Sequence, residues 1–397
     1  MNTPVRTLLA YLHRLIEYAA FYGVLFTLAG LFDRHHWFLG LFTHLKLPLA
    51  GCFIGYTLIE LVARHRHHVA AGVIFALVNA LPVLMLCLPA PHQPQPTAPA
   101  TVAQLRILQA NILTSNRDAA ALLSLIDREA PDVIVLQETG RRWLSDLAVL
   151  TNAYPVFAAM PREDNFGAAI FCKGSLTAGV TRASCPCRHL LQKPIACRCG
   201  TGILPVDVAR ASCPCRHLLQ KPLACKCGTG ILPVDVARAS CPCFMGGTPM
   251  PRAEIVYLDA YDCVPATRAR LTVNGRPLTI IGVHLFVPYN HATWLAQKQQ
   301  AQRLASLARD VTGSCVVTGD FNTTPWTARF QDILADSGLR DSARGRCLQP
   351  TWPAFLPPFA RIPLDHALHS PDVHIVTRRL GPSIGSDHLP VILDIAF

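Results

Sequence analysis

The hydrophobic pattern divides the chain near residue 90. Three apolar stretches, at roughly 8–32, 37–62 and 69–88, each approach the roughly 20 residues that a helix needs to cross a membrane. Arg14 and Glu17 lie in the first stretch, so we expect its apolar core to begin near Tyr18. Lys46 lies in the second stretch and must snorkel or lie near an interface. A cleaved signal peptide is the alternative, but no small-residue cleavage site precedes a polar start. We therefore predict a transmembrane region of about three helices in residues 1–90.

Basic residues indicate the orientation of these helices. Arg6 and Arg14 precede the main apolar part of the first stretch, and Arg64 and Arg66 separate the second from the third. Because positive charge prefers the cytoplasmic side, we place the N-terminus inside the cell. An odd number of spans then places the following domain outside the cytoplasm.

Residues 91–103 are rich in proline and predict a semi-rigid linker. After the linker, apolar runs of strand length alternate with helical patterns, which indicates an α/β domain over residues 104–397. We expect an Asn274-Gly275 turn to join two of the strands. The predicted strands are 105–110, 132–136, 167–172, 269–273, 278–284, 315–318, 366–370 and 391–395, and the predicted helices are 117–129 and 292–309.

A cysteine-rich tandem repeat interrupts this domain at residues 182–250. The segment 182–209 recurs at 210–237 with two differences, and the segment holds ten of the 16 cysteines. Four cysteines per unit could bind zinc or form disulfides. The proline, the glycine and the lack of periodicity favour a disordered insertion instead. We interpret the other six cysteines as ordinary small apolar residues; these are Cys52, Cys87, Cys172, Cys263, Cys315 and Cys347.

The net charge of +11 does not by itself indicate a nucleic-acid partner. Nine Lys or Arg and two Asp or Glu lie between Arg182 and Met250, a local balance of +7 that leaves +4 on the rest of the chain. The basic character therefore belongs mainly to the repeat, and it is weak evidence for DNA binding.

Polar residues that could carry chemistry fall at the ends of the predicted strands, where loops on a rigid sheet commonly assemble sites. Their carboxylate and amide oxygens suit Mg²⁺, which takes few protein ligands and keeps several waters. The two histidines could transfer protons near neutral pH. The set comprises Asn111, Glu138, His284, Asp320, Asn322, Asp365, Asp387 and His388.

Six stretches containing these residues occur in an order that resembles the endonuclease/exonuclease/phosphatase superfamily, which includes DNase I-like nucleases, sphingomyelinases and inositol-phosphate phosphatases. The stretches are LQANI at 108–112, VIVLQET at 133–139, IIGVHL at 280–285, VVTGDFNTTPW at 316–326, RIPLDHALHS at 361–370 and GSDHLPVIL at 385–393. The resemblance implies a four-layer α/β sandwich, in which helices flank two packed β-sheets. With the N-terminal helices, the chain is similar to a bacterial membrane-bound branch, which implies a multi-pass protein of the bacterial inner membrane.

The resemblance also implies a metal site. Glu138 would be the direct Mg²⁺ ligand, with Asn111 beside it in the metal shell. Asp387 would lie close to this metal or to a second one. Mn²⁺ and Ca²⁺ stay open as alternatives to Mg²⁺.

The remaining residues take catalytic roles by the same resemblance. Asp320 would position or deprotonate the attacking water, and Asn322 would hold a phosphate oxygen. His388 would act as general base or stabilise developing charge, with Asp365 orienting it. His284 would contact the scissile phosphate and could protonate the leaving oxygen. Which of Asp320 and His388 takes the proton stays open.

These roles predict Mg²⁺-dependent hydrolysis of phosphate esters by a phosphodiesterase or endonuclease, through in-line attack of water. A lipid-head-group or inositol-phosphate phosphoesterase is the alternative within the same chemistry. An inactive membrane or metal-binding module is the alternative from another class. The expected partners are the membrane and a phosphate ester of nucleic acid or a phospholipid head group, and no protein partner is predicted. Because the insert falls between motifs, we expect the site to survive it.

Overall fold

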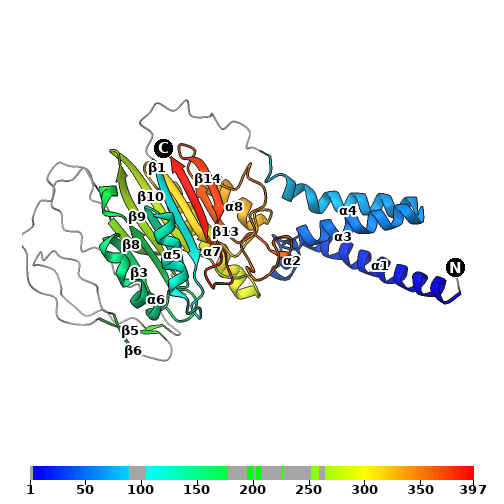
Figure 1. Cartoon of the computed structure of the whole chain (residues 1–397), viewed down its shortest axis with the longest axis horizontal. Coiled ribbons are helices and arrows are strands. Elements are labelled where there is room, and N and C mark those ends of the chain that lie inside the picture. The colour runs from blue at the N-terminus through cyan, green and yellow to red at the C-terminus, as the bar shows by residue number, and fades with distance from the viewer. Residues whose placement is uncertain are drawn as a thin grey trace, which may run out of the picture. The chain divides into compact units, whose positions relative to one another are not determined.

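The computed structural model describes residues 3–88, 104–177, 195–199, 203–206, 226–227, 252–258 and 264–397 (Figure 1). The chain forms two compact units, one of residues 1–179 with 249–397 and one of residues 180–248. In the smaller unit, β5 (Ile195–Cys199) pairs with β6 (Ile203–Val206) and with β7 (Lys226–Cys227). The linker prediction, and the predictions for the rest of the insert, lie outside the described residues.

Two six-stranded sheets form the body of the larger unit. The first runs in the order β14 (His374–Leu380), β15 (Val391–Ala396), β1 (Gln104–Asn111), β2 (Val133–Gln137), β4 (Ala168–Cys172) and β3 (Val156–Met160). The second runs in the order β12 (Arg340–Asp341), β13 (Asp365–His369), β11 (Ser314–Asp320), β10 (Arg276–His284), β9 (Pro265–Val273) and β8 (Arg252–Tyr257).

The core has three layers of apolar contact. One cluster lies between the sheets and includes Ile107 and Val133 of the first sheet with Ile280 of the second. On the outer face of the first sheet pack α5 (Ala119–Glu129), α6 (Arg141–Asp146) and η1 (Leu147–Asn152). On the outer face of the second pack α7 (His291–Arg309) and α8 (Ala328–Ser337). The helix–sheet–sheet–helix arrangement confirms the predicted four-layer sandwich (Figure 1).

Strand pairing decides where the polar strand ends meet. The pair β1 and β2 is parallel, and so is the pair β10 and β11, with His284 opposite Asp320. The carboxyl ends of parallel strands meet at one edge of a sheet. β13 runs antiparallel to β11 and sets Asp365 beside Asp320. The second sheet therefore collects three predicted site residues at one edge.

Every predicted strand and helix in the described part of the domain is present, and the bounds differ by a few residues. The Asn274-Gly275 turn is also present, with both residues at positive φ, as a tight hairpin turn requires. Most of the elements that the sequence pattern missed are short, or lie at sheet edges where one face is partly exposed. They are β3, β8, β12, β14 and α8, with the short 3₁₀ turns η1, η2 (Gly174–Thr177) and η3 (Pro358–Ala360).

The N-terminal region contains α1 (Thr3–Gly30), α2 (Trp37–Thr43), α3 (Lys46–Ala63) and α4 (Arg66–Leu84). Among the described residues only α3 and α4 are long and apolar enough to cross a membrane, so the expectation of three such helices was wrong. α1 has 28 residues, but it carries Arg14 and Glu17. The second apolar stretch is divided between α2 and α3.

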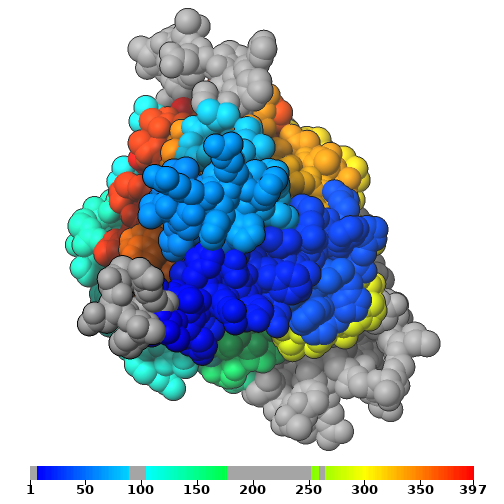
Figure 2. Space-filling model, turned by 90° about the vertical axis from the view of Figure 1, so that its right-hand side faces the viewer, coloured from blue at the N-terminus to red at the C-terminus, as the bar shows by residue number. Residues whose placement is uncertain are grey.

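Small residues let these helices approach closely. A Cβ atom at Gly72 of α4 would lie 2.4 Å from the Thr57 hydroxyl of α3, and one at Gly23 of α1 would lie 3.1 Å from the Phe53 ring. Between α1 and α4, Asn79 Nδ2 donates to Thr27 Oγ1 at 2.8 Å. Close small-residue contacts with occasional polar pairs are typical of helices that associate in membranes. Figure 2 looks onto this group of helices.

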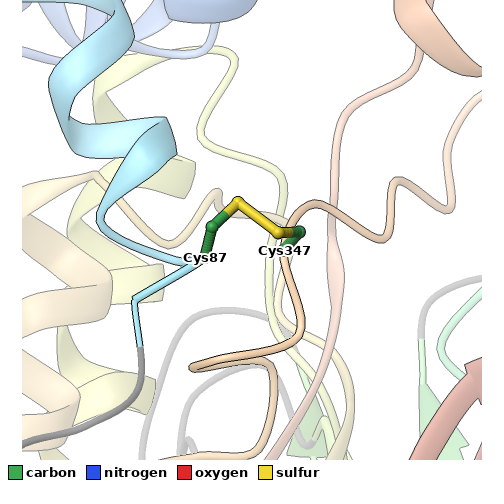
Figure 3. The surroundings of a disulfide bond; sticks show 2 residues. All are labelled: Cys87 and Cys347. Atoms are coloured by element: carbon green, nitrogen blue, oxygen red, sulfur yellow. A yellow bond between two sulfur atoms is a disulfide. The ribbon is translucent and has the colours of Figure 1, made fainter.

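A disulfide joins the end of the helical region to the sandwich domain (Figure 3). It links Cys87, just after α4, to Cys347, which lies 260 positions further along the chain. The interpretation of these two residues as ordinary apolar cysteines was therefore wrong. Neither Cys-x-x-Cys spacing nor any other local pattern marks them, because the pairing depends entirely on the tertiary fold.

Candidate active site

The site begins at the ends of β1 and β2. Asn111, the last residue of β1, donates from Nδ2 to Glu138 Oε1 at 3.0 Å and to Asp320 Oδ2 at 3.1 Å. Glu138 follows β2 in the first sheet, whereas Asp320 ends β11 in the second. One buried amide therefore connects carboxylates that belong to different sheets.

Glu138 is held in a backbone conformation that side chains other than glycine rarely adopt, with φ of +61°. The Thr114 N–H donates to Glu138 Oε2 and the Thr114 hydroxyl donates to its carbonyl oxygen, both at 3.1 Å. Such a conformation costs roughly 1–3 kcal/mol and clusters at functional sites, where the surrounding contacts enforce it. The carboxylate is thus fixed in place and only 8% exposed.

Asp320 lies at the centre of the set and is 1% exposed. Its Oδ2 atom lies 3.5 Å from His284 Nε2 and 3.7 Å from His388 Nε2. Its Oδ1 atom accepts the Asn322 N–H at 2.9 Å. Burial raises the pKa of Asp320 to about 7, although the nearby His388 charge opposes the rise. This carboxylate can therefore gain or lose a proton near neutral pH.

His388 and Asp365 form a buried pair. His388 Nδ1 lies 2.8 Å from Asp365 Oδ2, and Gln109 Nε2 donates to Asp365 Oδ1 at 2.9 Å. Burial lowers the pKa of His388, but the charges of Asp365 and Asp320 raise it, so that the pKa is about 10. Burial raises the pKa of Asp365, whereas His388 lowers it, and the net shift is downward. The imidazole therefore carries a positive charge at neutral pH.

His284 is the second buried histidine beside Asp320. Its ring packs against Phe166, with the ring centroids 5.1 Å apart. Burial lowers the pKa of His284, so this imidazole is neutral where His388 is charged. The charge of Glu138 opposes this lowering of the pKa but does not outweigh burial. His388, in contrast, is hydrogen-bonded to the buried carboxylate of Asp365, so the two histidines beside Asp320 differ in protonation state.

The other two predicted residues lie at the margin of this set. Asn322, with φ of +49°, donates from Nδ2 to the Leu285 carbonyl oxygen at 2.8 Å, which leaves its second amide hydrogen free to donate. Asp387 Oδ2 accepts the Trp352 indole N–H at 3.1 Å. The Asp387 Oδ1 atom is buried and has no hydrogen-bond partner within the described part of the chain.

Six of the eight predicted residues are therefore connected by direct contacts: Asn111, Glu138, Asp320, His284, His388 and Asp365. Asn322 joins through its backbone, and Asp387 adjoins His388 in sequence. Sequence reasoning missed Gln109, although it lies within the quoted stretch 108–112, because a polar residue inside a buried strand gives no local sign of its partner. It also missed Thr114, which fixes Glu138.

The oxygen donors fit a hard divalent cation. Glu138 and Asp387 offer carboxylate oxygens, and the unpartnered Asp387 Oδ1 atom is of the kind that a cation would satisfy. Asn111 lies beside Glu138, with its nitrogen facing the carboxylates and its Oδ1 atom accepting the Leu113 N–H at 3.1 Å, and its place in the metal shell stays a prediction. Ligand atoms of Asp320, Asp365 and His388 also lie within 4.8 Å of one another. In that trio, however, His388 Nδ1 is engaged by Asp365.

Comparison with known proteins gives one family. The model of the endonuclease/exonuclease/phosphatase family matches residues 108–388. No match was found among curated proteins.

Several solved structures are similar over 74% of this chain with a TM-score of 0.46. They include TDP2 of D. rerio complexed with a single-strand DNA product, which is 14% identical with 98% of its chain covered. Another is the human Nocturnin catalytic domain with bound sulfate, which is 17% identical with 94% covered. A third is an endonuclease/exonuclease/phosphatase from Bacteroides vulgatus, which is 14% identical with 98% covered. These similarities are too distant to assign a substrate. The match over residues 108–388 shows that the chain belongs to the endonuclease/exonuclease/phosphatase family.

Proposed function

We propose that the protein is a Mg²⁺-dependent phosphodiesterase. Family membership points to phosphoester hydrolysis as the class of reaction. The observation that carries the finer proposal is the contact of Asn111 with both Glu138 and Asp320, which gathers a cation ligand and a proton acceptor around one point. Glu138 and Asp387 would hold the cation, which would neutralise charge on the phosphoryl oxygens.

The charge states suggest how the proton moves. Asp320, with its pKa near 7, positions the attacking water and takes its proton. His388, held protonated by Asp365, stabilises the charge that develops on the phosphoryl oxygens. The free amide hydrogen of Asn322 donates to one of these oxygens, and neutral His284 hydrogen-bonds the phosphate. This assignment makes Asp320, rather than His388, the base.

A substrate panel tests the proposal. Purified protein is assayed with bis-p-nitrophenyl phosphate, plasmid DNA and inositol phosphates, in Mg²⁺ and in EDTA. We expect the diester to be hydrolysed in Mg²⁺ and turnover to stop in EDTA and return when Mg²⁺ is restored. Equal turnover in EDTA would remove the metal from the proposal, and no turnover of any ester would favour the inactive module.

A specific observation favours a second substrate class, the phosphoester of a membrane lipid. The loop between β12 and β13, which hydrogen-bonds to Asp387, carries Phe355 and Phe359, whose exposed fractions are 79% and 76%. The Ala354 N–H donates to the Asp387 carbonyl oxygen at 2.7 Å, and η3 lies against α3. Exposed aromatic side chains beside a membrane-length helix are typical of residues that enter the membrane interface.

The loop after β11 also contacts the helical region. The Trp326 indole donates to the Thr43 carbonyl oxygen at 2.8 Å, and His44 Nδ1 lies 3.1 Å from the Thr324 hydroxyl. If α3 and α4 cross a membrane, the loop between β12 and β13 and the loop after β11 both lie near the membrane surface. A lipid head group would then lie close to the site residues. We therefore propose that the site opens toward the lipid surface.

Vesicles distinguish lipid from soluble substrates. The double substitution Phe355→Asp and Phe359→Asp should lower hydrolysis of a phosphodiester lipid in mixed vesicles by about tenfold or more, because charge opposes burial in the interface. Turnover of bis-p-nitrophenyl phosphate should be unchanged. A matched control, Val149→Asp on the exposed turn η1, should change neither activity. Equal loss on both substrates would show a structural effect and contradict membrane access.

The disulfide suggests in which cellular compartment the sandwich domain lies. Disulfides persist in oxidising compartments and are rare in the cytosol. Because the expectation of three spans was wrong, an odd number of spans no longer supports an outward orientation of this domain. The Cys87–Cys347 bond is therefore the observation that supports a proposed site outside the cytoplasm of a bacterial cell, in a protein of the inner membrane. A reporter enzyme fused to the C-terminus should then be active only if it folds outside the cytoplasm.

A further inference from the structure

A second group of metal-type ligands lies in the helical region. His13 of α1, Glu60 of α3 and His65 of the turn before α4 converge, with His13 Nε2 2.8 Å from Glu60 Oε1 and His65 Nδ1 2.7 Å from Glu60 Oε2. His68 of α4 adds a third imidazole, with Nδ1 3.3 Å from Glu60 Oε2. Two sequence-distant segments, α1 and the end of α3 with the start of α4, therefore direct four ligand side chains to one place.

Burial makes this group unlike a chance surface cluster. Glu60 has no exposed surface, whereas the three histidines are 26% to 50% exposed. A buried carboxylate is costly unless a positive charge compensates it. No Lys or Arg forms an ion pair with Glu60 among the described residues, and imidazoles alone fill that position. A bound divalent cation would supply a compensating positive charge.

The surroundings offer room and a further ligand. Glu17 Oε1 lies 3.8 Å from both His13 Nδ1 and His68 Nδ1. A cavity of about 320 Å³, lined by Glu17 and His68 together with Tyr56 and Phe75, adjoins the group. A polar corner of an otherwise apolar cavity gives an ion and its water a place beside the ligands.

We propose that His13, Glu60, His65 and His68 bind a transition-metal ion of the Zn²⁺ class and thereby fasten α1 to the turn between α3 and α4. Imidazole nitrogen with one carboxylate is a donor set that suits such ions, unlike the all-oxygen set that suits Mg²⁺. Ligands at about 2.0–2.1 Å in a tetrahedron lie roughly 3.3 Å apart, so contacts of 2.7 to 3.3 Å need only small adjustments.

This site is separate from the candidate active site. α3 begins at Lys46, beside the Thr43 and His44 contacts to the sandwich domain, and the ligands lie at its other end. At 1.5 Å per residue, the path from Lys46 to Glu60 is roughly 20 Å. Loss of this site should therefore leave the chemistry at Asp320 intact.

Metal content of the full chain, purified in detergent, tests the proposal. After exposure to Zn²⁺ and exhaustive dialysis, the parent protein should retain one more ion per chain than His65→Ala or His68→Ala. His67→Ala, which removes an exposed imidazole between them that makes no contact with Glu60, is the matched control and should retain the parent content. Measuring differences excludes zinc held by the cysteine-rich repeat, which is the same in every variant.

Two further measurements distinguish loss of zinc binding from poor folding of a variant. Zn²⁺ should raise the melting temperature of the parent and of His67→Ala, and the rise should be absent in His68→Ala. Hydrolysis of bis-p-nitrophenyl phosphate in Mg²⁺ should be the same in all of these proteins. Equal zinc content in the parent, His65→Ala and His68→Ala would overturn the proposal and leave Glu60 as the acceptor of a histidine hydrogen-bond network.

Discussion

The two ligand groups of this chain differ in how the fold builds them. At the sandwich edge, strand pairing brings together Asn111, Glu138 and Asp320, which come from the ends of three strands that are far apart in sequence. In the helical region, His65 and His68 follow Glu60 closely in sequence and only His13 comes from afar. The first group is rich in oxygen and the second in imidazole, so each suits a different cation. The two proposed sites should therefore bind different cations, and substitutions should separate them.

The largest expected effect comes from removing the charge of Glu138. Glu138→Gln should lower Mg²⁺-dependent turnover of bis-p-nitrophenyl phosphate by about a hundredfold or more, because a metal ligand and its hydrogen-bonded neighbours are perturbed together. The zinc content that depends on His65 should be unchanged. Asp127→Asn, on the exposed face of α5, is the control and should retain full turnover. Parallel loss of turnover and of zinc would mean that the two sites are not separate.

The next largest effect is expected from removing the disulfide, because this bond cross-links the helical region to the sandwich domain. Cys347→Ser should lower the free energy of unfolding by about 2–4 kcal/mol, the usual contribution of a disulfide. Thermal unfolding of the purified protein measures the change, with Cys52→Ser, which alters an exposed free cysteine, as the control. Unchanged stability would indicate that the contacts of Trp326 and His44 hold the regions together without the covalent bond.

A smaller effect, with a distinctive pH signature, is expected at Asp365. The Asp365→Asn variant loses the charge that raises the pKa of His388 from its ordinary value to about 10. Because the protonated imidazole is the active form, activity is lost as pH rises through this pKa. The alkaline limb of the pH–rate profile should therefore move to lower pH, with turnover at neutral pH reduced by about 10- to 100-fold. An unmoved limb would contradict the protonated role of His388.

Most strands of the sandwich domain and most of the candidate site residues could be predicted from the sequence. The strands that end in Asn111 and Asp320 are mostly buried and rich in apolar residues, and short apolar segments with polar ends are visible in sequence. Local pattern cannot show long-range pairing. The Cys87–Cys347 bond and the contact of Gln109 with Asp365 join segments that only the folded chain brings together. The third expected membrane helix was wrong for a different reason: the part of α1 from Tyr18, where its apolar core was expected to begin, to Gly30 is shorter than the roughly 20 residues of a membrane span.

The smallest expected effect concerns the hydrogen bond from Trp326 to the Thr43 carbonyl oxygen. Trp326→Phe removes the donor but keeps an aromatic ring, so the free energy of unfolding should fall by about 0.5–1.5 kcal/mol. Because Trp326 follows Asn322 in the loop after β11, a shift of this loop would also disturb the contact of Asn322 with Leu285. A modest rise in KM for lipid substrate with unchanged kcat on bis-p-nitrophenyl phosphate would show that the helices position the mouth of the site and not its chemistry. A fall in kcat on the soluble diester would instead show that the helical region helps to position the catalytic residues. The helical region and the sandwich domain could then not be treated as independent.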